Sequence, residues 1–372
     1  HEMHHYEDPR AASIEALKIV QKQRGWVPDG AADAIGEILG IPASDVEGVA
    51  TFYSQIFRVP VGRHVIRVCD SMTCFIGGHE NLLGSLKDKL GNRSNASSEV
   101  EFHGAHAELI GEEGKGIRTI IQMVQLTRQD CAIASAGLMR SGLAHALNHA
   151  RHRSVFQKHL ADQPLMQAVL SDMALHVEAS VALVMRLCRA FDRAGADAGE
   201  AAYMRLLTPA IKYWTCKSAP GFLYEAMECL GGNGYVEEGI LARHYRESPV
   251  NAIWEGSGNV MCLDVLRALG READAALVVL RALADETEGL PGAAEAVASI
   301  GQSFRRPDSE RIARLAVEKL ALLAAAAALN QVSQKSAELF AATRLAERHA
   351  GMYGAVDLSD ADQRALLARA LP

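Results

Sequence analysis

Apolar residues recur at helical spacing along most of the chain, and this pattern predicts a mainly helical protein. The longest helical patterns cover residues 117–153, 166–193 and 200–230, and a further one opens over 261–269. Short links separate these four segments, which is typical of an antiparallel four-helix bundle. Pro209 and Pro220 lie inside the third segment, so we expect a kink or a new helix start at each of them.

Helical patterns also flank this bundle on both sides. Residues 271–372 are rich in Ala and Leu and predict a helical tail, with 311–336 as its clearest helix. Residues 1–62 predict a small helical bundle with helices over 13–20 and 31–39 and a third capped by Ser44 or Asp45. Residues 64–69 alternate between apolar and polar positions and predict a strand.

Length and composition narrow the class of protein. A chain of 372 residues exceeds the usual size of one core, so two or more domains are expected. A net charge of −7 argues against a protein devoted to nucleic acid, and seven scattered cysteines suit a reducing cytoplasm. The first residues are polar, without a signal-peptide core, and the longest apolar run, 320–329, is too short to span a bilayer. We therefore expect a cytoplasmic protein without membrane insertion.

Two glycine-rich breaks carry the candidate chemistry. The first is residues 230–235, LGGNGY, where the backbone can approach a bulky ligand and present N–H groups to phosphate. The second is Trp254-Glu255 followed by residues 256–259, GSGN, where partial desolvation would suit Glu255 to act as a general base. We expect Glu255 and the glycine pair to border one crevice. The alternative is two ordinary connecting loops with Glu255 in water.

The sequences of these two breaks resemble a known family. GGNGY (231–235) and RESPVNAIWEGSGNVMCLDVLR (246–267) resemble the C-terminal helical domain of the acyl-CoA dehydrogenase family, in particular its AidB-like branch. Further matching segments occur in the same order at 111–120, 126–137, 149–165 and 210–217. The resemblance runs from about Leu90 to the C-terminus. It implies an FAD cofactor, an acyl-CoA substrate and a homo-oligomer, a dimer or a tetramer, whose copies share each FAD site.

The resemblance also implies roles for single residues. Glu255 matches the base that removes the α-proton of an acyl-CoA. Ser257 and Asn259 match the turn that contacts FAD. Gly231 and Gly232 match the segment that meets the FAD of a neighbouring subunit, and Arg153 with Phe156 matches the pair that holds the same cofactor. Thr127 and Arg128 match positions on the substrate side. The chain departs from the family at Gln157, where Gly is usual, and at Pro164, which leaves the role of Gln163 open.

The first quarter of the chain resembles a different family. Residues 16–57 and 60–74 resemble the E subunit, 24-kDa type, of NADH-quinone oxidoreductase, a helical bundle that leads into a thioredoxin-like [2Fe–2S] domain. Cys69 and Cys74 match the first pair of cluster ligands of that family. The second pair is absent downstream, and a cluster needs four thiolates. We therefore do not expect a [2Fe–2S] cluster.

The two resemblances predict four segments. They are the helical domain 1–62, a truncated thioredoxin-like segment 63–91, the dehydrogenase-type helical domain 92–270 and the helical tail 271–372. Residues 92–103 resemble the last strand of the middle β-domain of the dehydrogenases, and the rest of that domain is missing. The join near 85–91 fits a natural fusion, an assembly artefact or a deliberate construction. The predicted function is flavin-dependent acyl-CoA dehydrogenation; the alternatives are an electron-transfer component of the 24-kDa type and an inactive chimera.

Three further motifs give weaker signals. His1-Glu2-Met3-His4-His5 spells a zinc-protease motif, but that motif works only inside a helix. His145 and His149 lie one helical turn apart without further metal ligands, which favours an ordinary helix face. The arginines at 305, 306, 311 and 314 form a basic cluster, and the AidB-like branch is associated with DNA. Residues 271–372 nevertheless hold 12 basic and 14 acidic residues, so DNA is a weak candidate.

Overall fold

The computed structural model describes residues 9–52, 56–58, 88–95, 97, 109–346 and 352–370. The chain divides into two compact units, one of residues 1–89 with 93–105 and one of residues 90–92 with 106–372. The predicted strand over 64–69, Cys69, Cys74 and the motif at 1–5 lie outside the described residues, as does most of 92–103.

The smaller unit contains three short helices around its own core. The turn η2 (Pro9–Ala12) leads into α1 (Ser13–Arg24), α2 (Asp29–Leu39) and α3 (Ala43–Phe52). Gly25 and Gly40 end the first two helices at φ 82° and 67°, a left-handed conformation that favours glycine. Leu17, Val27 and Val46 form the centre of the core, and all three are fully buried. The helices predicted in this segment are therefore present, each a few residues longer than its pattern.

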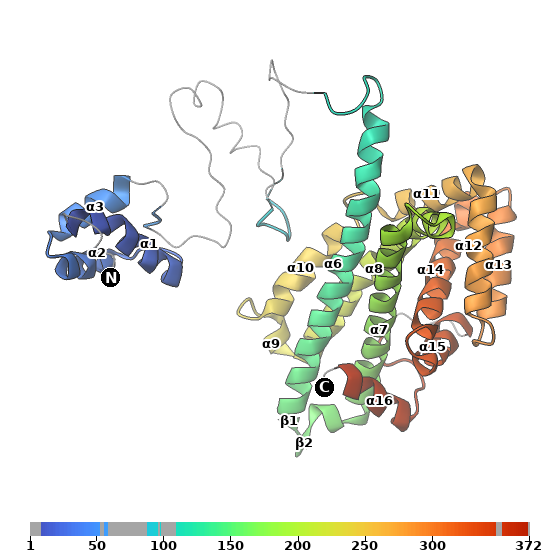
Figure 1. Ribbon diagram of the computed structural model, residues 1–372. Helices are drawn as coiled ribbons and strands as arrows, with labels where there is room; N and C mark the ends of the chain where they lie inside the picture. The colour runs from blue at the N-terminus through green and yellow to red at the C-terminus, as the bar shows by residue number, and fades with distance from the viewer. Residues whose placement is uncertain are drawn as a thin grey trace. The chain divides into compact units, whose positions relative to one another are not determined.

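Three long helices form the centre of the larger unit. They are α6 (Gly116–His152), α7 (Pro164–Arg193) and α8 (Ala198–Cys229), which pack on one another (Figure 1). Asp197 caps α8, because its carboxylate accepts hydrogen bonds from the N–H groups of Gly199 (2.8 Å) and Glu200 (3.2 Å). Pro209 and Pro220 lie within α8, and the helix does not restart at either.

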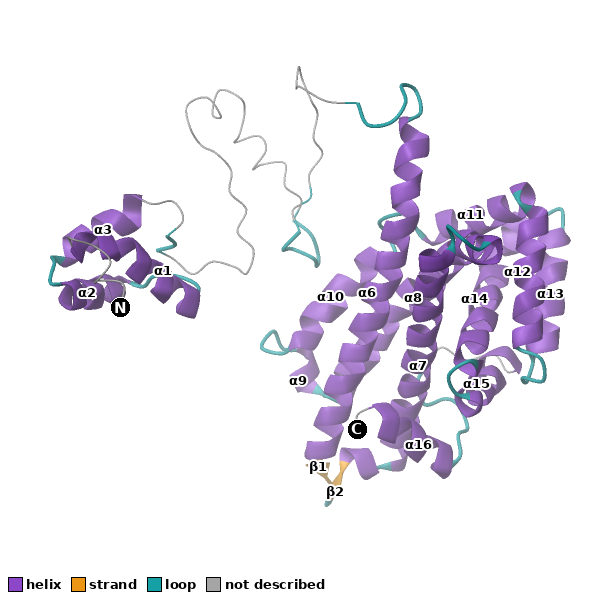
Figure 2. Ribbon diagram, viewed as in Figure 1, coloured by secondary structure: helices purple, strands orange, loops and turns teal. Residues whose placement is uncertain are grey.

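A short hairpin joins α6 to α7. Its strands β1 (Ser154–Val155) and β2 (Lys158–His159) are antiparallel, and the turn η3 (Leu160–Asp162) follows them. Phe156 and Gln157, between the strands, both have positive φ values, 48° and 66°, as a tight two-residue hairpin turn requires. These two strands are the only ones among the described residues (Figure 2).

Three shorter helices complete the bundle. They are α9 (Gly232–Tyr235), α10 (Ile240–Asn251) and α11 (Gly258–Arg271). The helices α10 and α11 both pack on α8, and α10 also packs on α6. The predicted helical bundle is thus confirmed, with the helix over 261–269 observed as α11 and with α10 as a helix that the sequence pattern did not predict.

The tail adds a second helical layer. It consists of α12 (Ala273–Glu286), α13 (Ala293–Arg305), η4 (Ser309–Ile312), α14 (Ala313–Asn330), α15 (Gln334–Ala341), η5 (Ala342–Ala346) and α16 (Asp360–Ala370). Buried alanines and leucines of α14 pack it against both α7 and α8. The single helix predicted over 311–336 is wrong: α14 ends at Asn330, and Ser333 starts α15 by accepting a hydrogen bond from the N–H of Ser336 (3.2 Å).

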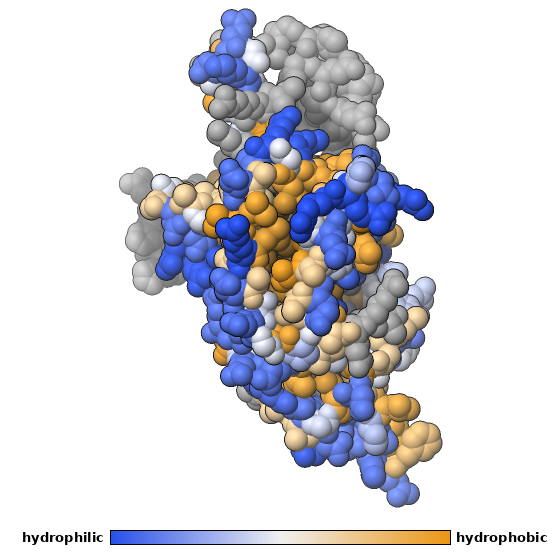
Figure 3. Space-filling model, turned by 90° about the vertical axis from the view of Figure 1, so that its right-hand side faces the viewer, coloured by the Kyte–Doolittle hydropathy of each residue, from blue (hydrophilic) through white to orange (hydrophobic). Residues whose placement is uncertain are grey.

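Among the residues that the structure describes, one helix is long and apolar enough to cross a membrane by length and composition. In α7 the mean hydropathy of an 18-residue window is 1.5, but 67% of that window is buried inside the protein. Burial of that extent is typical of a core helix, and α7 has α6, α8 and α14 as neighbours. The space-filling view shows that the surface also carries apolar areas bordered by hydrophilic residues (Figure 3).

Candidate active site

The turn between α10 and α11 holds Glu255 in an unusual backbone conformation. Its φ is 58°, and Gly256 follows at 110°. Left-handed backbone costs an ordinary residue about 1–2 kcal/mol, so other contacts must hold the turn. Glycine suits this position because other residues rarely adopt a φ of 110°; a methyl group there would also lie 2.5 Å from Cε of Met261, the flexible end of that side chain. The turn therefore fixes the direction of the Glu255 backbone.

Two cations from other helices hold this turn. Arg128 of α6 donates from Nε to the carbonyl of Glu255 (3.0 Å), and Lys212 of α8 donates from Nζ to the carbonyl of Gly256 (2.9 Å). Lys212 is only 1% exposed. Burial, with the positive charge of Arg128, lowers the pKa of Lys212, while the charge of Glu255 opposes that shift.

Arg128 is itself anchored to α11. Its Nη1 donates to Asp264 (2.7 Å), and Arg205 of α8 donates to the other oxygen of the same carboxylate (3.2 Å). The sequence placed Thr127 and Arg128 on the substrate side. In the structure the Arg128 side chain is almost buried under the turn, and the Thr127 hydroxyl donates to the carbonyl of Val124 (3.1 Å). The contacts of Arg128 make it a group that positions Glu255.

The first residues of α11 face outward. Ser257 precedes the helix, and both Ser257 and Asn259 are exposed. The Asn259 side chain accepts a hydrogen bond from Nε of Arg314 in α14 (2.8 Å). Exposed N–H groups at a helix N-terminus, with an arginine beside them, suit a negatively charged group.

A second group of predicted residues lies where α6 and α8 end. Arg153, Gly231 and Gly232 line one cavity of about 460 Å³ together with His149. Gly231 has φ 60°, and a methyl group built on Gly232 would meet no atom within 4 Å. The open backbone and the arginine leave room for a phosphate-bearing ligand.

Phe156 lies in the adjoining hairpin and is 94% exposed. Exposure of the phenylalanine ring to water and a positive φ of its backbone both cost free energy in a single copy of the chain. Gln157, beside it, takes the left-handed conformation for which the family usually has glycine. The hairpin therefore presents an aromatic face outward, as a contact to a ligand or to another chain requires.

These two groups of residues lie far apart in one copy of the chain. Arg128 and Arg153 are both on α6 or directly after it, and a helix rises 1.5 Å per residue, so about 37 Å separates them. Glu255 is not among the residues that line the cavity of Arg153 and Gly232. The expectation that Glu255 and the glycine pair border one crevice is therefore not met within a single copy.

The sequence patterns did not single out two residues of this arrangement, Lys212 and Asp264, which contact the turn and its anchor. Arg314, which contacts Asn259, was singled out only as part of a basic cluster. A lysine within the apolar segment around 206–214 was the available signal, because buried lysines are rare. In the described part of the chain, no group of three or more His, Cys, Asp or Glu side chains suits a metal ion.

The comparisons with known proteins follow the same division of the chain. Residues 114–270 match the family profile of the acyl-CoA dehydrogenase C-terminal domain. The chain is 47% identical over 289 residues to acyl-CoA dehydrogenase AidB of Escherichia coli, which covers 77% of this chain and 52% of the relative. The crystal structure of Caenorhabditis elegans ACDH-11 in complex with C11-CoA superposes with a TM-score of 0.65 at 27% identity, over 76% of this chain and 52% of that one.

Residues 1–112 match a different profile, the thioredoxin-like [2Fe–2S] ferredoxin. Over 91 residues the chain is 84% identical to the E subunit of NADH-quinone oxidoreductase from Pseudomonas aeruginosa, which covers 24% of this chain and 55% of the relative. The chain thus spans about half the length of each curated relative that it matches.

The larger unit therefore has the helical fold of the acyl-CoA dehydrogenase C-terminal domain, whose profile residues 114–270 match. Its sequence matches the AidB-like proteins, and it follows a segment that matches the E subunit of NADH-quinone oxidoreductase. Both resemblances that the sequence predicted are confirmed.

Proposed function

We propose that the larger unit is the C-terminal half of a flavin-dependent acyl-CoA dehydrogenase of the AidB type. The observation that carries this proposal is the turn at Glu255, which Arg128 and Lys212 hold in a strained conformation from two different helices. Strain of this kind persists where the surrounding structure determines it, and it gathers at functional sites. Ser257 and Asn259, directly after the turn, supply an exposed helix N-terminus beside the carboxylate.

The proposed reaction is the oxidation of an acyl thioester to its α,β-unsaturated form. The Glu255 carboxylate removes the α-proton, which leaves its electron pair to form the double bond. The substrate then loses a hydride from its β-carbon, and a bound flavin supplies the two-electron acceptor for it. Arg128 and Lys212 act on Glu255 through the backbone, so their role is to set where the carboxylate lies.

The cofactor site would be shared between copies of the chain. Arg128, which contacts the turn before Ser257 and Asn259, lies about 37 Å along α6 from Arg153, which shares its cavity with Gly231 and Gly232. A single flavin that uses both groups must therefore lie between two copies, each of which gives one half of the site. The exposed ring of Phe156 and the apolar areas of the surface support association of this kind (Figure 3). We therefore propose a homo-oligomer, a dimer or a tetramer.

A mixing experiment tests the shared site. Arg153→Ala in one chain and Asn259→Ala in another should each weaken flavin binding, which is measured by visible absorbance of the purified, FAD-saturated protein. Co-expression of the two variants should restore bound flavin, because a mixed dimer contains one intact site. Failure to restore binding would show that both groups serve one copy or that neither holds flavin.

Glu255→Gln tests the proposed base. The amide keeps the size of the side chain but cannot accept the proton, so we expect loss of any acyl-CoA oxidation while flavin binding and thermal stability stay unchanged. Glu295→Gln on α13, another exposed carboxylate, serves as the control and should retain the wild-type rate. Equal turnover in wild type and Glu255→Gln would remove Glu255 from this role.

The smaller unit supports the alternative function, an electron-transfer component of the 24-kDa type. Its support is the match over residues 1–112, but the described residues include neither Cys69 nor Cys74. Iron and acid-labile sulfide in the purified protein would favour this function, whereas bound flavin alone would favour the dehydrogenase. An inactive chimera would hold neither.

DNA remains a weaker proposal for the tail. Arg306 is paired with Asp308 (2.7 Å), Arg305 donates to the carbonyl of Gly301 (2.9 Å), and Arg314 donates to Asn259. These contacts occupy three of the four arginines that formed the basic cluster.

A cytoplasmic location is part of the proposal as well, and five described cysteines are free thiols, as a reducing compartment allows.

A further inference from the structure

A cavity of about 600 Å³ shares one lining residue, Glu228, with the cavity of Arg153 and Gly231. It is formed by α7, α8, α14 and residues 352–353, and its lining combines aromatic rings with carboxylates. Cavities of this size accept small molecules, and the polar groups in them determine which class of molecule binds. None of the residues proposed to contact flavin or acyl-CoA lines it.

Four rings form one wall of this cavity. His176 stacks on Trp214 with ring centroids 4.9 Å apart and 28° between the planes. Tyr353 meets Phe222 edge to face at 5.3 Å and His176 at 5.8 Å. Because the rings pack on one another from three different segments, their faces keep fixed directions.

The segment that carries Tyr353 is fastened to α7. The N–H of Gly354 donates to Asp172 (3.0 Å), and the same buried carboxylate pairs with Arg344. A methyl group on Gly354 would lie 2.9 Å from Cγ2 of Val169, which shows how closely this segment approaches the helix. The aromatic wall is therefore a built part of the fold.

The charges that line the cavity are mainly negative. Glu225 and Glu228 lie one turn apart on α8, Glu318 comes from α14, and among the lining residues that the structure describes Lys217 is the one lysine or arginine. Burial, Glu228 and Asp172, in that order, each raise the pKa of Glu225. The cavity therefore contains mutual repulsion that a bound cation would relieve.

We propose that this cavity binds an organic ammonium cation, such as a quaternary or alkylated amine. Aromatic faces attract such cations through their quadrupoles, and the attraction grows where water is excluded. Glu225, Glu228 and Glu318 supply the balancing charge at the same cavity. The carboxylates would repel an anion, and a neutral molecule would leave them without an opposite charge.

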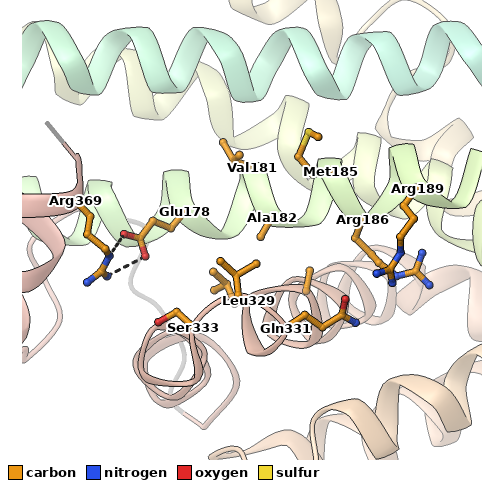
Figure 4. Close-up of a pocket in the computed structure, with 12 residues that line it drawn as sticks. Glu178, Val181, Ala182, Met185, Arg186, Arg189, Leu329, Gln331, Ser333 and Arg369 are labelled. Carbon is orange, nitrogen blue, oxygen red and sulfur yellow. Dashed lines mark hydrogen bonds and ion pairs between the residues drawn. The ribbon is translucent and has the colours of Figure 1, made fainter. Parts of the chain in front are cut away.

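A second cavity of similar size makes a useful comparison. It is an apolar groove of about 580 Å³ between α7 and the helices α14 to α16 (Figure 4). At one end Glu178 is paired with Arg369 (2.8 Å), and at the other Arg186 is paired with Glu200 (2.7 Å). Three arginines, Arg186, Arg189 and Arg369, line this groove against one glutamate, so its charge is of the opposite sign to that of the aromatic cavity.

Calorimetric titration of the full chain tests the proposal with choline and with 3,3-dimethylbutan-1-ol, its uncharged isostere. The two probes have the same shape, so their difference isolates the charge. We expect saturable binding of choline and at least roughly tenfold weaker binding of the alcohol, since cation–π and ionic contacts of this kind contribute more than a factor of ten together. Equal affinities, or no saturable choline binding, would overturn the proposal.

The double variant Glu225→Gln with Glu318→Gln identifies the cavity, because neither residue lines the cavity of Arg153. It keeps the shape of both side chains and removes two of the three negative charges, so choline should bind roughly tenfold or more weakly. Glu238→Gln, an exposed carboxylate in the loop before α10, is the control and should bind choline as wild type does. Circular dichroism confirms that the variants are folded. Undiminished choline binding in the folded double variant would place the cation elsewhere and overturn the assignment.

Discussion

Positive φ values at residues other than glycine gather in the proposed site. In the described part of the chain they occur at Asn92, Phe156, Gln157 and Glu255; Phe156 and Glu255 are proposed site residues, and Gln157 follows Phe156 in the same hairpin. Each such conformation costs of order 1 kcal/mol or more, so a fold keeps it where neighbouring contacts or function require it. At Glu255 the neighbouring contacts are those of Arg128 and Lys212.

The hairpin between α6 and α7 contains a strain that a single substitution should release. Gln157→Gly should stabilise the larger unit by about 1 kcal/mol, because glycine takes the observed φ of 66° without a steric penalty. Urea unfolding followed by circular dichroism measures the change. Lys158→Gly, in the adjacent strand, should destabilise instead. A loss of stability in Gln157→Gly would show that the glutamine side chain makes a contact that compensates the strain.

The buried thiols of the bundle make its stability depend on pH. Burial is the largest cause that raises the pKa of Cys216 from 9.0 to about 12. Because the folded-state pKa is above the unfolded value, the folded state holds the proton more tightly, and its advantage is lost as pH rises from 9.0 toward 12. Wild type should therefore lose stability relative to Cys216→Ala over that interval.

Unfolding free energies of both proteins, measured one pH unit below and one above the ordinary thiol value, test this prediction. Lys212 has a lowered pKa and acts in the opposite direction, and Cys216 is among the groups that raise the Lys212 pKa, so the comparison reports the coupled pair. A difference between the two proteins that stays constant across the interval would contradict a raised pKa at Cys216.

At the scale of elements, α6, α8 and α11 are joined by one buried charge cluster. Asp264 of α11 is 6% exposed and accepts from Arg128 of α6 and Arg205 of α8. The cluster links three helices beneath the turn that carries Glu255. Its loss should therefore affect both the stability of the bundle and the position of the turn.

Asp264→Asn tests this cluster. Asparagine keeps the shape but leaves Arg128 without a negative partner in a nearly buried position, which should cost about 3 kcal/mol of unfolding free energy. Chemical denaturation measures the loss. Asp285→Asn, on the exposed side of α12, should change stability by less than about 0.5 kcal/mol. Similar losses of unfolding free energy in the two variants would show that Asp264 does not stabilise the bundle.

The long helices were predictable because each has a complete local signal. Apolar periodicity placed α6, α7 and α8 within two residues of their observed ends, and Asp197 caps the last of them. The interruption of the predicted helix 311–336 was not found, because alanines and leucines on both sides continue the same pattern. Pro220 led to the opposite error: a kink or a new helix start was expected there, but α8 continues through it.

The chemistry of the site was predictable only in part. The family motif singled out Glu255, Ser257 and Asn259, which the structure places in and directly after one turn. The distance between Glu255 and the cavity of Arg153 did not follow from the motif, because it depends on how far apart two ends of a long helix lie. Lys212 was missed for a similar reason: its partner is 44 residues away along the chain.

At the scale of the whole molecule, two separate cores correspond to the two matched relatives. The core around Leu17 and Val46 shares no residue with the core of the larger unit, which includes Leu183. Each core is made of residues that match one relative, and each relative is matched over about half its length. Each unit must therefore derive its stability from its own buried residues.

Leu17→Ala should reveal this separation. The substitution creates a cavity in the smaller core and should cost that unit about 2–5 kcal/mol, while the unfolding of the larger unit stays unchanged. Differential scanning calorimetry measures the two transitions. Leu183→Ala is the reciprocal variant and should shift only the transition of the larger unit. A common shift of both transitions in either variant would show that the units unfold as one.

The contacts beneath the Glu255 turn also determine how late in synthesis the larger unit can reach its folded structure. Arg128 and Glu255 are 127 residues apart in the sequence, and Arg128 pairs with Asp264 across 136 residues. Contacts between such distant residues form late, after the intervening chain has been made and collapsed. A nascent chain released before residue 264 would contain Arg128 with no acidic partner on α11, and the cell's proteases should remove it first.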